Sequence, residues 1–356
     1  MLFIVALTSA LAGAPAVWAA AAAATAGGRP RGTCDIYAAA GTPCVAAHST
    51  VRALYATYDG PLYSLRRASD QATMVIRVDP ATGFADASAQ KAFCPALSSS
   101  LHLVCEVERI FDQSPRANHL DKVQVDPHDN PHKKPIRGVD PMSEELTIAG
   151  HAVFSAYFEG GDHTGNGTMG YRAENTTGVA QNDTAESMYA VVSGTHYNGR
   201  CCFDYGNTEG NHGKPHPHPK SGDGKMEAIC FSSSKPAGGT WSTGPGDGPW
   251  VRADLEMGVW AGDRRGTHAA VAVNPRNVPI NSTFVTAMLK GKSGAWALKH
   301  GNAQSGGLTT LFDGPRPPGY EVMSKQGSII LGIGGDTSDG GIGTFCKRMD
   351  ITESRF

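Results

Sequence analysis

The 356-residue chain has little net charge and few charged residues. Lysine and arginine total 31 against 33 aspartate and glutamate, so the formal net charge is −2, and charged residues make up only 18% of the chain. Nucleic acids and anionic membrane surfaces attract proteins through clustered positive charge. The composition therefore gives no reason to expect either as a partner, and a neutral substrate fits better.

Other missing sequence features exclude further classes of protein and of binding site. Beyond the amino terminus, no apolar run reaches the roughly 20 residues that a bilayer-spanning helix needs. The Gly-rich run at 327–341 is followed by neither a Lys-Ser/Thr pair nor a helical pattern, which excludes a phosphate loop. The Pro-rich segment 207–225 has no cysteine or carboxylate spacing that would complete a zinc site around its histidines. We therefore expect no metal at His212, His216 and His218.

The amino terminus is typical of a secretory signal peptide. Residues 1–26 are apolar but interrupted by Ser, Thr, Gly and Pro, and they include an Ala-rich stretch with A-x-A cleavage sites. We expect cleavage, a secreted extracellular protein and no membrane association afterwards; a retained signal anchor is the alternative. Residues 27–356 would then form one domain. Eight cysteines and four N-x-S/T sequons agree with this route, the sequons being at Asn166, Asn175, Asn182 and Asn281.

Glycine, in contrast, is abundant. The 44 Gly residues show no Gly-X-Y period, which excludes collagen, and 5 Trp, 10 Tyr and 12 Phe argue against disorder. Short apolar runs separated by Gly-rich spacers predict an all-β fold of stacked antiparallel sheets. The predicted strands are at 151–158, 187–194, 226–232, 251–260, 267–273, 282–289 and 328–333.

One helix and two long loops complete the predicted organisation. Helical spacing of apolar residues favours a short helix at 48–58, with Ser49 or Thr50 as its cap. The segments 121–140 and 207–225 are polar and Pro-rich without apolar periodicity, so we expect surface loops there.

Two carboxylates stand out in the predicted strand 251–260. Apolar residues alternate there with polar ones, so the period of two would place Asp254 and Glu256 on one face, roughly 7 Å apart, beside Trp260. Paired carboxylates suit general acid/base or nucleophilic chemistry, but a solvent-facing strand would show the same alternation.

A third carboxylate follows an apolar strand. The run at 328–333 ends in Gly334-Gly335-Asp336, where glycine lets a ligand approach the backbone closely and the Asp would project from the end of the sheet. A turn-forming aspartate is the alternative.

The adjacent cysteines Cys201 and Cys202 are unusual. Neighbouring Cα atoms lie about 3.8 Å apart, closer than in ordinary disulfides, so a bond between them would force a strained ring. Alternatively each pairs with a distant partner, and eight cysteines allow 105 connectivities, which spacing cannot decide.

Together these segments resemble the catalytic domain of the α-L-arabinofuranosidases of glycoside hydrolase family 54, chiefly fungal secreted enzymes. The resemblance covers about 310 residues in order. It implies a jelly-roll-like (concanavalin-like) β-sandwich that cleaves arabinofuranosides with retention of configuration. It is carried by CDIYAAAGTPCVAAHSTVRALY at 34–55, FADASAQKAFC at 84–94, FDQSPRANHL at 111–120, MYAVVSGTHYNGRCCFDYGN at 188–207, GDGPW at 246–250 and MSKQGSIILGIGGDTSDGGIGTF at 323–345.

The resemblance also implies roles for single residues. The family's nucleophile falls on Glu256 and its general acid/base on Asp336. A retaining mechanism places two such carboxyls about 5–5.5 Å apart. Substrate-binding positions fall on the vicinal disulfide Cys201–Cys202, the aromatic wall Trp241, the hydroxyl-binding Asp254, the backbone of Gly335, and on Met257 and Gly258.

The chain departs from the family pattern in three places. Met257 and Gly258 stand where the family carries two Asn that hold the sugar, so amide hydrogen bonds are lost, at about 1–3 kcal/mol for each polar group left unpaired. The family's closing strand is not recognisable after residue 345, and the arabinose-binding β-trefoil module often found next is not recognised.

The resemblance further implies the disulfides Cys34–Cys44 and Cys94–Cys105. Cys230 and Cys346 stand where the family tends to carry Tyr, and we expect them to pair with each other.

The functional hypothesis is an extracellular exo-α-L-arabinofuranosidase acting on arabinan or arabinoxylan. It would be a monomer whose partner is an arabinose-containing plant polysaccharide, and it would need no cofactor because two carboxylates suffice. The alternative is a catalytically impaired, arabinose-binding, lectin-like domain.

Overall fold

A computed structural model gives the structure of the chain. It describes residues 28–95, 104–124, 136–160, 168–197, 199, 203–210, 224–235, 241–256, 258–263, 272–335 and 341–352. The predicted signal peptide, Asn166 and the histidines of 207–225 lie outside these ranges. Within them, no helix has the length and apolar character needed to cross a bilayer.

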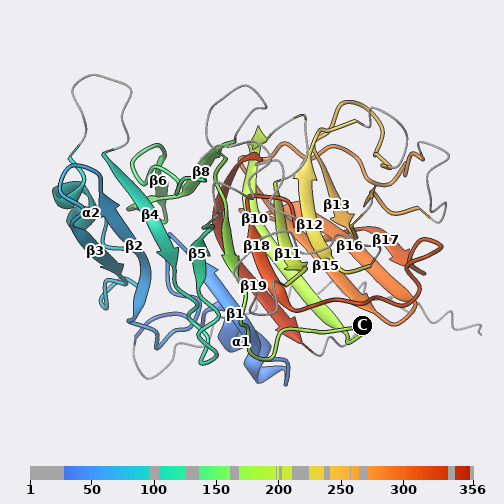
Figure 1. Cartoon of the computed structure of the whole chain (residues 1–356), viewed down its shortest axis with the longest axis horizontal. Coiled ribbons are helices and arrows are strands. Elements are labelled where there is room, and N and C mark those ends of the chain that lie inside the picture. Colours follow the sequence, from blue (N-terminus) through green and yellow to red (C-terminus); the bar gives the residue numbers. More distant parts are fainter. Residues whose placement is uncertain are drawn as a thin grey trace, which may run out of the picture.

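The first of two large sheets has seven strands, and its strands come from distant parts of the sequence. Its order is β1-β19-β10-β15-β16-β17, with β8 also paired to β19, and all its pairs are antiparallel. The amino-terminal β1 lies beside the carboxy-terminal β19 (Figure 1). The strands are β1 (Cys44–Ser49), β8 (Ala156–Glu159), β10 (Glu186–Tyr197), β15 (Phe284–Lys292), β16 (Ala295–Asn302), β17 (Thr309–Gly314) and β19 (Ile342–Thr352).

The second sheet has ten strands in the order β14-β13-β12-β11-β18-β9-β5-β4-β2-β3, and a separate hairpin joins β6 (Glu145–Ile148) to β7 (His151–Phe154). The ten strands are β2 (Pro61–Arg67), β3 (Thr73–Arg77), β4 (Cys105–Ile110), β5 (Leu120–Lys122), β9 (Tyr171–Ala173), β11 (Asp204–Thr208), β12 (Glu227–Ser232), β13 (Trp250–Asp254), β14 (Val259–Trp260) and β18 (Ser328–Leu331).

The main core fills the space between the two sheets. Phe345 of β19 stacks on Tyr205 of β11, with ring centroids 6.2 Å apart and an interplanar angle of 4°. Strand register then fixes which residues face this core, because directly opposed residues share a face. The inward row of the ten-stranded sheet is apolar and consists of Ala253, Ile229, Tyr205, Leu331 and Tyr171. The neighbouring, outward row consists of Asp254, Ala228, Gly206, Ile330 and Arg172.

These sheets confirm the predicted all-β sandwich. Of the predicted strands, 187–194, 226–232, 282–289 and 328–333 correspond to β10, β12, β15 and β18, and 151–158 divides into β7 and β8. Most of 267–273 lies outside the described residues. The predicted loops are shorter than expected, because Lys122 belongs to β5 and residues 207–208 belong to β11.

The predicted helix at 48–58 is wrong. β1 runs to Ser49, and the Ser49 side-chain oxygen accepts hydrogen bonds from the backbone N–H groups of Val51 and Arg52. Leu54 N–H donates to Gln113 Oε1 at 2.7 Å, so a side chain from a distant segment replaces helical bonding. Apolar residues recur at helical spacing here because an irregular segment buries them.

The described residues form two short helices elsewhere, α1 (Thr33–Ala39) and α2 (Ala87–Phe93), rather than one. Asp86 caps α2 by accepting a hydrogen bond from Ala89 N–H, which is typical N-cap chemistry. The disulfide Cys34–Cys44 ties α1 to β1, and Cys94–Cys105 ties the end of α2 to β4. Both pairs confirm the prediction.

The predicted Cys230–Cys346 pair is wrong. Cys230 is opposed to Asp204 and therefore faces outward from the ten-stranded sheet, on the side away from Tyr205. Cys346 follows the inward-facing Phe345 and lines a cavity on the outer face of the seven-stranded sheet. The two thiols lie on opposite sides of the sandwich, which excludes a bond between them. Cys201 and Cys202 lie outside the described residues.

Candidate active site

The turn after β13 carries the two carboxylates predicted from the sequence. β13 ends at Asp254, so the expected single strand 251–260 is wrong beyond that residue: the alternation holds within β13, where Ala253 faces inward and Asp254 outward, but β14 begins only at Val259. The chain turns between them, with Leu255 N–H donating to the Gly258 carbonyl at 3.3 Å. Asp254 and Glu256 are therefore brought together by a turn and not by a shared strand face.

Glu256 has an unusual backbone conformation. Its φ of 62° lies in the left-handed region that non-glycine residues rarely adopt. Two hydrogen bonds hold it there: Glu256 N–H donates to Asp254 Oδ1 at 2.9 Å, and the Tyr320 hydroxyl donates to the Glu256 carbonyl at 2.8 Å. Such strain costs about 1–3 kcal/mol and clusters at functional sites. The half-buried Glu256 side chain is thus attached to a firmly positioned backbone.

Burial favours the protonated form of Asp254. The residue is only 7% exposed, and burial raises its pKa to about 7, with the charge of Glu209 adding to the effect and the hydrogen bond from Glu256 N–H opposing it. The fully buried Asp204 lies nearby, and its pKa is raised by burial and then by the charge of Asp254. Asp204 and Asp254 are therefore a pair of buried carboxyl groups next to Glu256, and their raised pKa values favour the protonated forms.

The segment that follows β18 reaches the same face. Ile333 packs on the outward side of the ten-stranded sheet with Ile330, Ala228 and Met226, and Ala228 lies directly opposite Asp254. Gly335, two residues further on, is buried. Asp336 itself lies outside the described residues. The structure brings the two predicted catalytic segments to one outer face of the sandwich, through Gly335 on one side and Glu256 on the other.

Arg172 and Glu209 surround Gly335. Arg172 Nη1 donates to the Gly335 carbonyl and Nη2 to the Glu209 carbonyl. A Cβ atom at Gly335 would lie 2.3 Å from Glu209 Oε2 and 2.6 Å from Thr208 Oγ1, so any larger residue there would displace these side chains. Sequence reasoning missed Arg172, Glu209, Asp204 and Tyr320, and it placed Glu209 in an expected surface loop. Only tertiary contacts reveal these residues.

The other predicted binding residues fall near this edge of the sheet. Ser242 N–H donates to the carbonyl of Val259 in β14 at 2.8 Å. This bond places the half-buried Trp241 beside the Glu256 turn. Gly258 is packed against the buried Trp260: a Cβ there would lie 2.4 Å from that ring. Met257 lies outside the described residues.

Three of the four sequon asparagines are described, and all three are exposed: Asn175, Asn182 and Asn281. Their glycosylation stays a prediction. Within the described residues, no cluster of three or more His, Cys, Asp or Glu side chains is arranged to hold a metal ion.

Comparison with known proteins identifies the family of the chain. The sequence profile described as "Alpha-L-arabinofuranosidase B, catalytic" matches residues 33–352. An "Arabinofuranosidase/B-xylosidase" of Trichoderma koningii is 44% identical over 320 residues, which cover 88% of this chain and 57% of that protein. An "Alpha-L-arabinofuranosidase B" of Aspergillus niger is 42% identical over 320 residues, covering 88% and 58%. The chain thus spans a little over half the length of these relatives.

Solved structures agree as well. A crystal structure of an arabinofuranosidase in complex with arabinofuranosyl-α-1,2-xylobiose superposes with a TM-score of 0.77 at 40% identity, covering 91% of this chain and 62% of that one. A family 54 α-L-arabinofuranosidase soaked with a cyclic sulfate inhibitor matches with the same values. This chain therefore belongs to glycoside hydrolase family 54, as an α-L-arabinofuranosidase B catalytic domain.

Proposed function

We propose that this protein is a secreted, retaining exo-α-L-arabinofuranosidase that releases terminal arabinofuranosyl groups from arabinan or arabinoxylan. The observation that carries the proposal is the strained turn after β13, which holds the half-buried Glu256 directly beside the buried Asp254. The relative bound to arabinofuranosyl-α-1,2-xylobiose supports an arabinose-bearing substrate. Exposed sequon asparagines are compatible with a secretory route.

The proposed reaction is a double displacement. A carboxylate oxygen of Glu256 attacks the anomeric carbon while the bond to the leaving oxygen breaks, and Asp336 gives that oxygen its proton. Asp336 then takes a proton from water, the water oxygen attacks the anomeric carbon, and the bond to Glu256 breaks. Two inversions give net retention. The hydrogen bonds that fix the Glu256 backbone support the nucleophile's role, because attack depends on a fixed geometry.

Asp254 suits the binding of a sugar hydroxyl. With a pKa of about 7 it keeps a proton under mildly acidic conditions, so its carboxyl is able both to donate and to accept a hydrogen bond. One of its oxygens already accepts from Glu256 N–H. A hydroxyl held by Asp254 would therefore be fixed relative to the nucleophile.

The alternative, an impaired arabinose-binding domain, is favoured by position 258. Gly258 has no side chain to hold a sugar, and the Trp260 ring fills the space that a side chain would need. This domain would bind arabinose but leave the glycosidic bond intact.

A chromogenic arabinofuranoside separates the two functions. We expect the purified protein to hydrolyse 4-nitrophenyl α-L-arabinofuranoside, the Glu256→Gln variant to be inactive, and proton NMR to show the retained anomer first. Hydrolysis no faster than a heat-killed control, together with saturable arabinose binding, would establish the lectin-like alternative instead.

A further inference from the structure

A cavity lies on the outer face of the sandwich opposite to Glu256. It encloses about 580 Å³, within the 300–1,000 Å³ typical of ligand pockets. Its floor is formed by outward residues of β10 and β15, among them Tyr189 and Phe284, and its walls are α1, the β6–β7 turn and the loop 302–308. Cys346 also lines it, whereas the preceding Phe345 faces the core. The two large sheets therefore separate this groove from Glu256.

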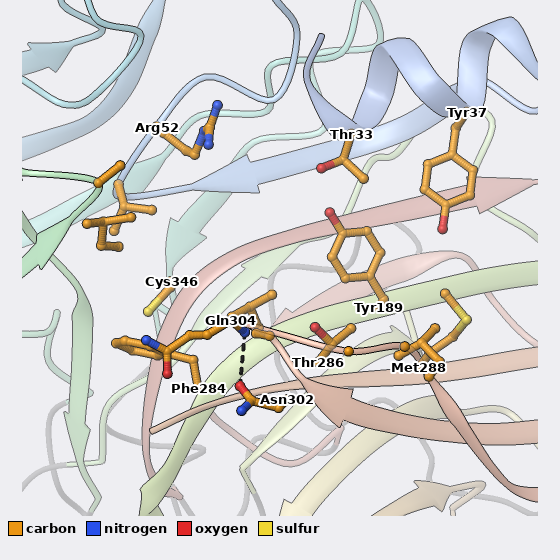
Figure 2. Close-up of a pocket in the computed structure, with 18 of the residues that line it drawn as sticks. Thr33, Tyr37, Arg52, Tyr189, Phe284, Thr286, Met288, Asn302, Gln304 and Cys346 are labelled. Atoms are coloured by element: carbon orange, nitrogen blue, oxygen red, sulfur yellow. Dashed lines mark hydrogen bonds between the residues drawn. The ribbon is translucent and has the colours of Figure 1, made fainter. Parts of the chain in front are cut away.

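A disulfide and backbone hydrogen bonds hold the walls of the groove in place. The Cys34–Cys44 disulfide fixes α1, which contributes Thr33 and Tyr37, to the edge strand β1. On the other side, Ala303 N–H donates to the Phe284 carbonyl at 2.9 Å and pins the loop 302–308 to β15. Gln304 N–H donates to Asn302 Oδ1 at 2.9 Å (Figure 2). A ligand would meet surfaces that are already positioned, which lowers the entropic cost of binding.

The lining combines aromatic rings with uncharged hydrogen-bonding groups. Tyr37 and Tyr189 are stacked, with centroids 6.5 Å apart, and Phe284 lies across the groove from them (Figure 2). Hydroxyl and amide groups come from Thr33, Thr286, Asn302 and Gln304, and the one charged lining residue among those described is Arg52. A neutral ligand with apolar faces and many hydroxyl groups matches these surfaces.

Tyr189 adds an independent indication. The residue is 5% exposed, and its hydroxyl has no hydrogen bond that meets normal geometry within the described part of the chain. The Thr33 side chain faces it in Figure 2 and, as a nearby hydrogen-bonding group, opposes the rise in the Tyr189 pKa that burial causes, but the contact falls outside normal hydrogen-bond geometry. Buried polar groups are normally satisfied, so an unsatisfied hydroxyl at the floor of a groove favours a polar ligand.

We propose that this groove is a second carbohydrate site, which binds a neutral pentose-containing oligosaccharide segment of the polymer. The choice of polymer rests on the proposed function, while the site itself rests on the groove. Binding there would hold the enzyme on an arabinoxylan chain without occupying the residues around Glu256. Small substrates would gain nothing from it.

Affinity electrophoresis in gels containing soluble arabinoxylan tests the proposal. The Glu256→Gln protein serves as the parent, because we expect it not to degrade the polymer and because every sample then carries the same candidate active-site residues. We expect the double variant Asn302→Ala/Gln304→Ala to weaken retention at least threefold, and Phe284→Ala to do the same. Asn302 and Gln304 are exposed, so their loss should leave folding intact. Gln181→Ala, another exposed amide outside the groove, is the matched control and should behave as the parent.

Equal retention of the groove variants and the parent would overturn the proposal, as would a parent that arabinoxylan does not retain. The same substitutions in the Glu256 protein should leave hydrolysis of 4-nitrophenyl α-L-arabinofuranoside unchanged. If the Glu256 protein hydrolyses no arabinofuranoside while groove-dependent retention persists, the proposed function fails and the second site stands.

Discussion

Arg172 Nη1 donates a hydrogen bond to the carbonyl of Gly335, the residue immediately before Asp336. The second nitrogen of the same guanidinium bonds the Glu209 carbonyl, so one planar group joins the end of β11 to the segment after β18. Because the peptide unit is planar, this hydrogen bond also orients the peptide link that leads on from Gly335.

Arg172→Lys should therefore impair protonation of the leaving group more than attack. Lysine keeps the charge but not the two-pronged geometry. We expect kcat to fall about tenfold for alkyl or polymeric arabinofuranosides and less than threefold for 4-nitrophenyl arabinofuranoside, whose leaving group needs little protonation. Arg109→Lys, an exposed arginine paired with Asp121, is the control. An equal fall for both substrate classes would show that Arg172 acts only on overall structure.

Tyr320→Phe should loosen the nucleophile. It removes the hydroxyl that bonds the Glu256 carbonyl while keeping the ring contact with Trp260. One hydrogen bond contributes about 0.5–1.5 kcal/mol, so kcat should fall roughly threefold to tenfold with little change in KM. Steady-state kinetics on the chromogenic substrate measures this, and an unchanged kcat would mean that the bond does not position Glu256.

The raised pKa of Asp254 predicts a pH-dependent stability. A carboxyl whose folded pKa of about 7 exceeds its ordinary value near 4 is protonated more in the folded than in the unfolded chain across that interval. The free energy of unfolding therefore falls as pH rises from about 4 to 7. Asp254→Asn, which mimics the protonated form, should match the unmodified protein below about pH 4, and its advantage in stability should grow as the pH rises to about 7.

Urea unfolding at each pH measures that difference. Asp70→Asn is the control: Asp70 has its pKa lowered to about 2 by the hydrogen bond from Arg67, so its contribution stays constant between pH 5 and 8. A stability difference between Asp254→Asn and the unmodified protein that does not vary with pH would refute the assigned protonation state.

Cys230 should be a thiol that iodoacetamide modifies only after unfolding. It is buried, and burial raises its pKa, which disfavours the reactive thiolate. Peptide mapping without reductant should recover the bonded pairs Cys34–Cys44 and Cys94–Cys105. A peptide joining Cys230 to Cys346 would contradict the strand register described above.

The sequence predicted well what depends on local pattern and resemblance: most strands and the two loop-closing disulfides. The predictions failed where contacts between distant segments of the chain determine the structure. The apolar spacing at 48–58 belongs to an irregular segment held by Gln113. The Cys230–Cys346 pair could be rejected only once the structure showed which way β12 and β19, two strands of different sheets, present these side chains. Arg172 and Glu209 become visible only because register places Arg172 on the same outward row as Asp254.

The central claim is that Glu256 is the nucleophile and Asp336 the acid/base. Azide rescue of Glu256→Gly, with the product's configuration read by NMR, tests it most directly. Azide should restore activity and give an arabinofuranosyl azide of inverted configuration, because the anion attacks from the face that the carboxylate has left. The matched Asp336→Ala variant should give the azide of retained configuration, through the intermediate that Glu256 still forms. A retained product from Glu256→Gly, or full hydrolysis by that variant without azide, would contradict the account.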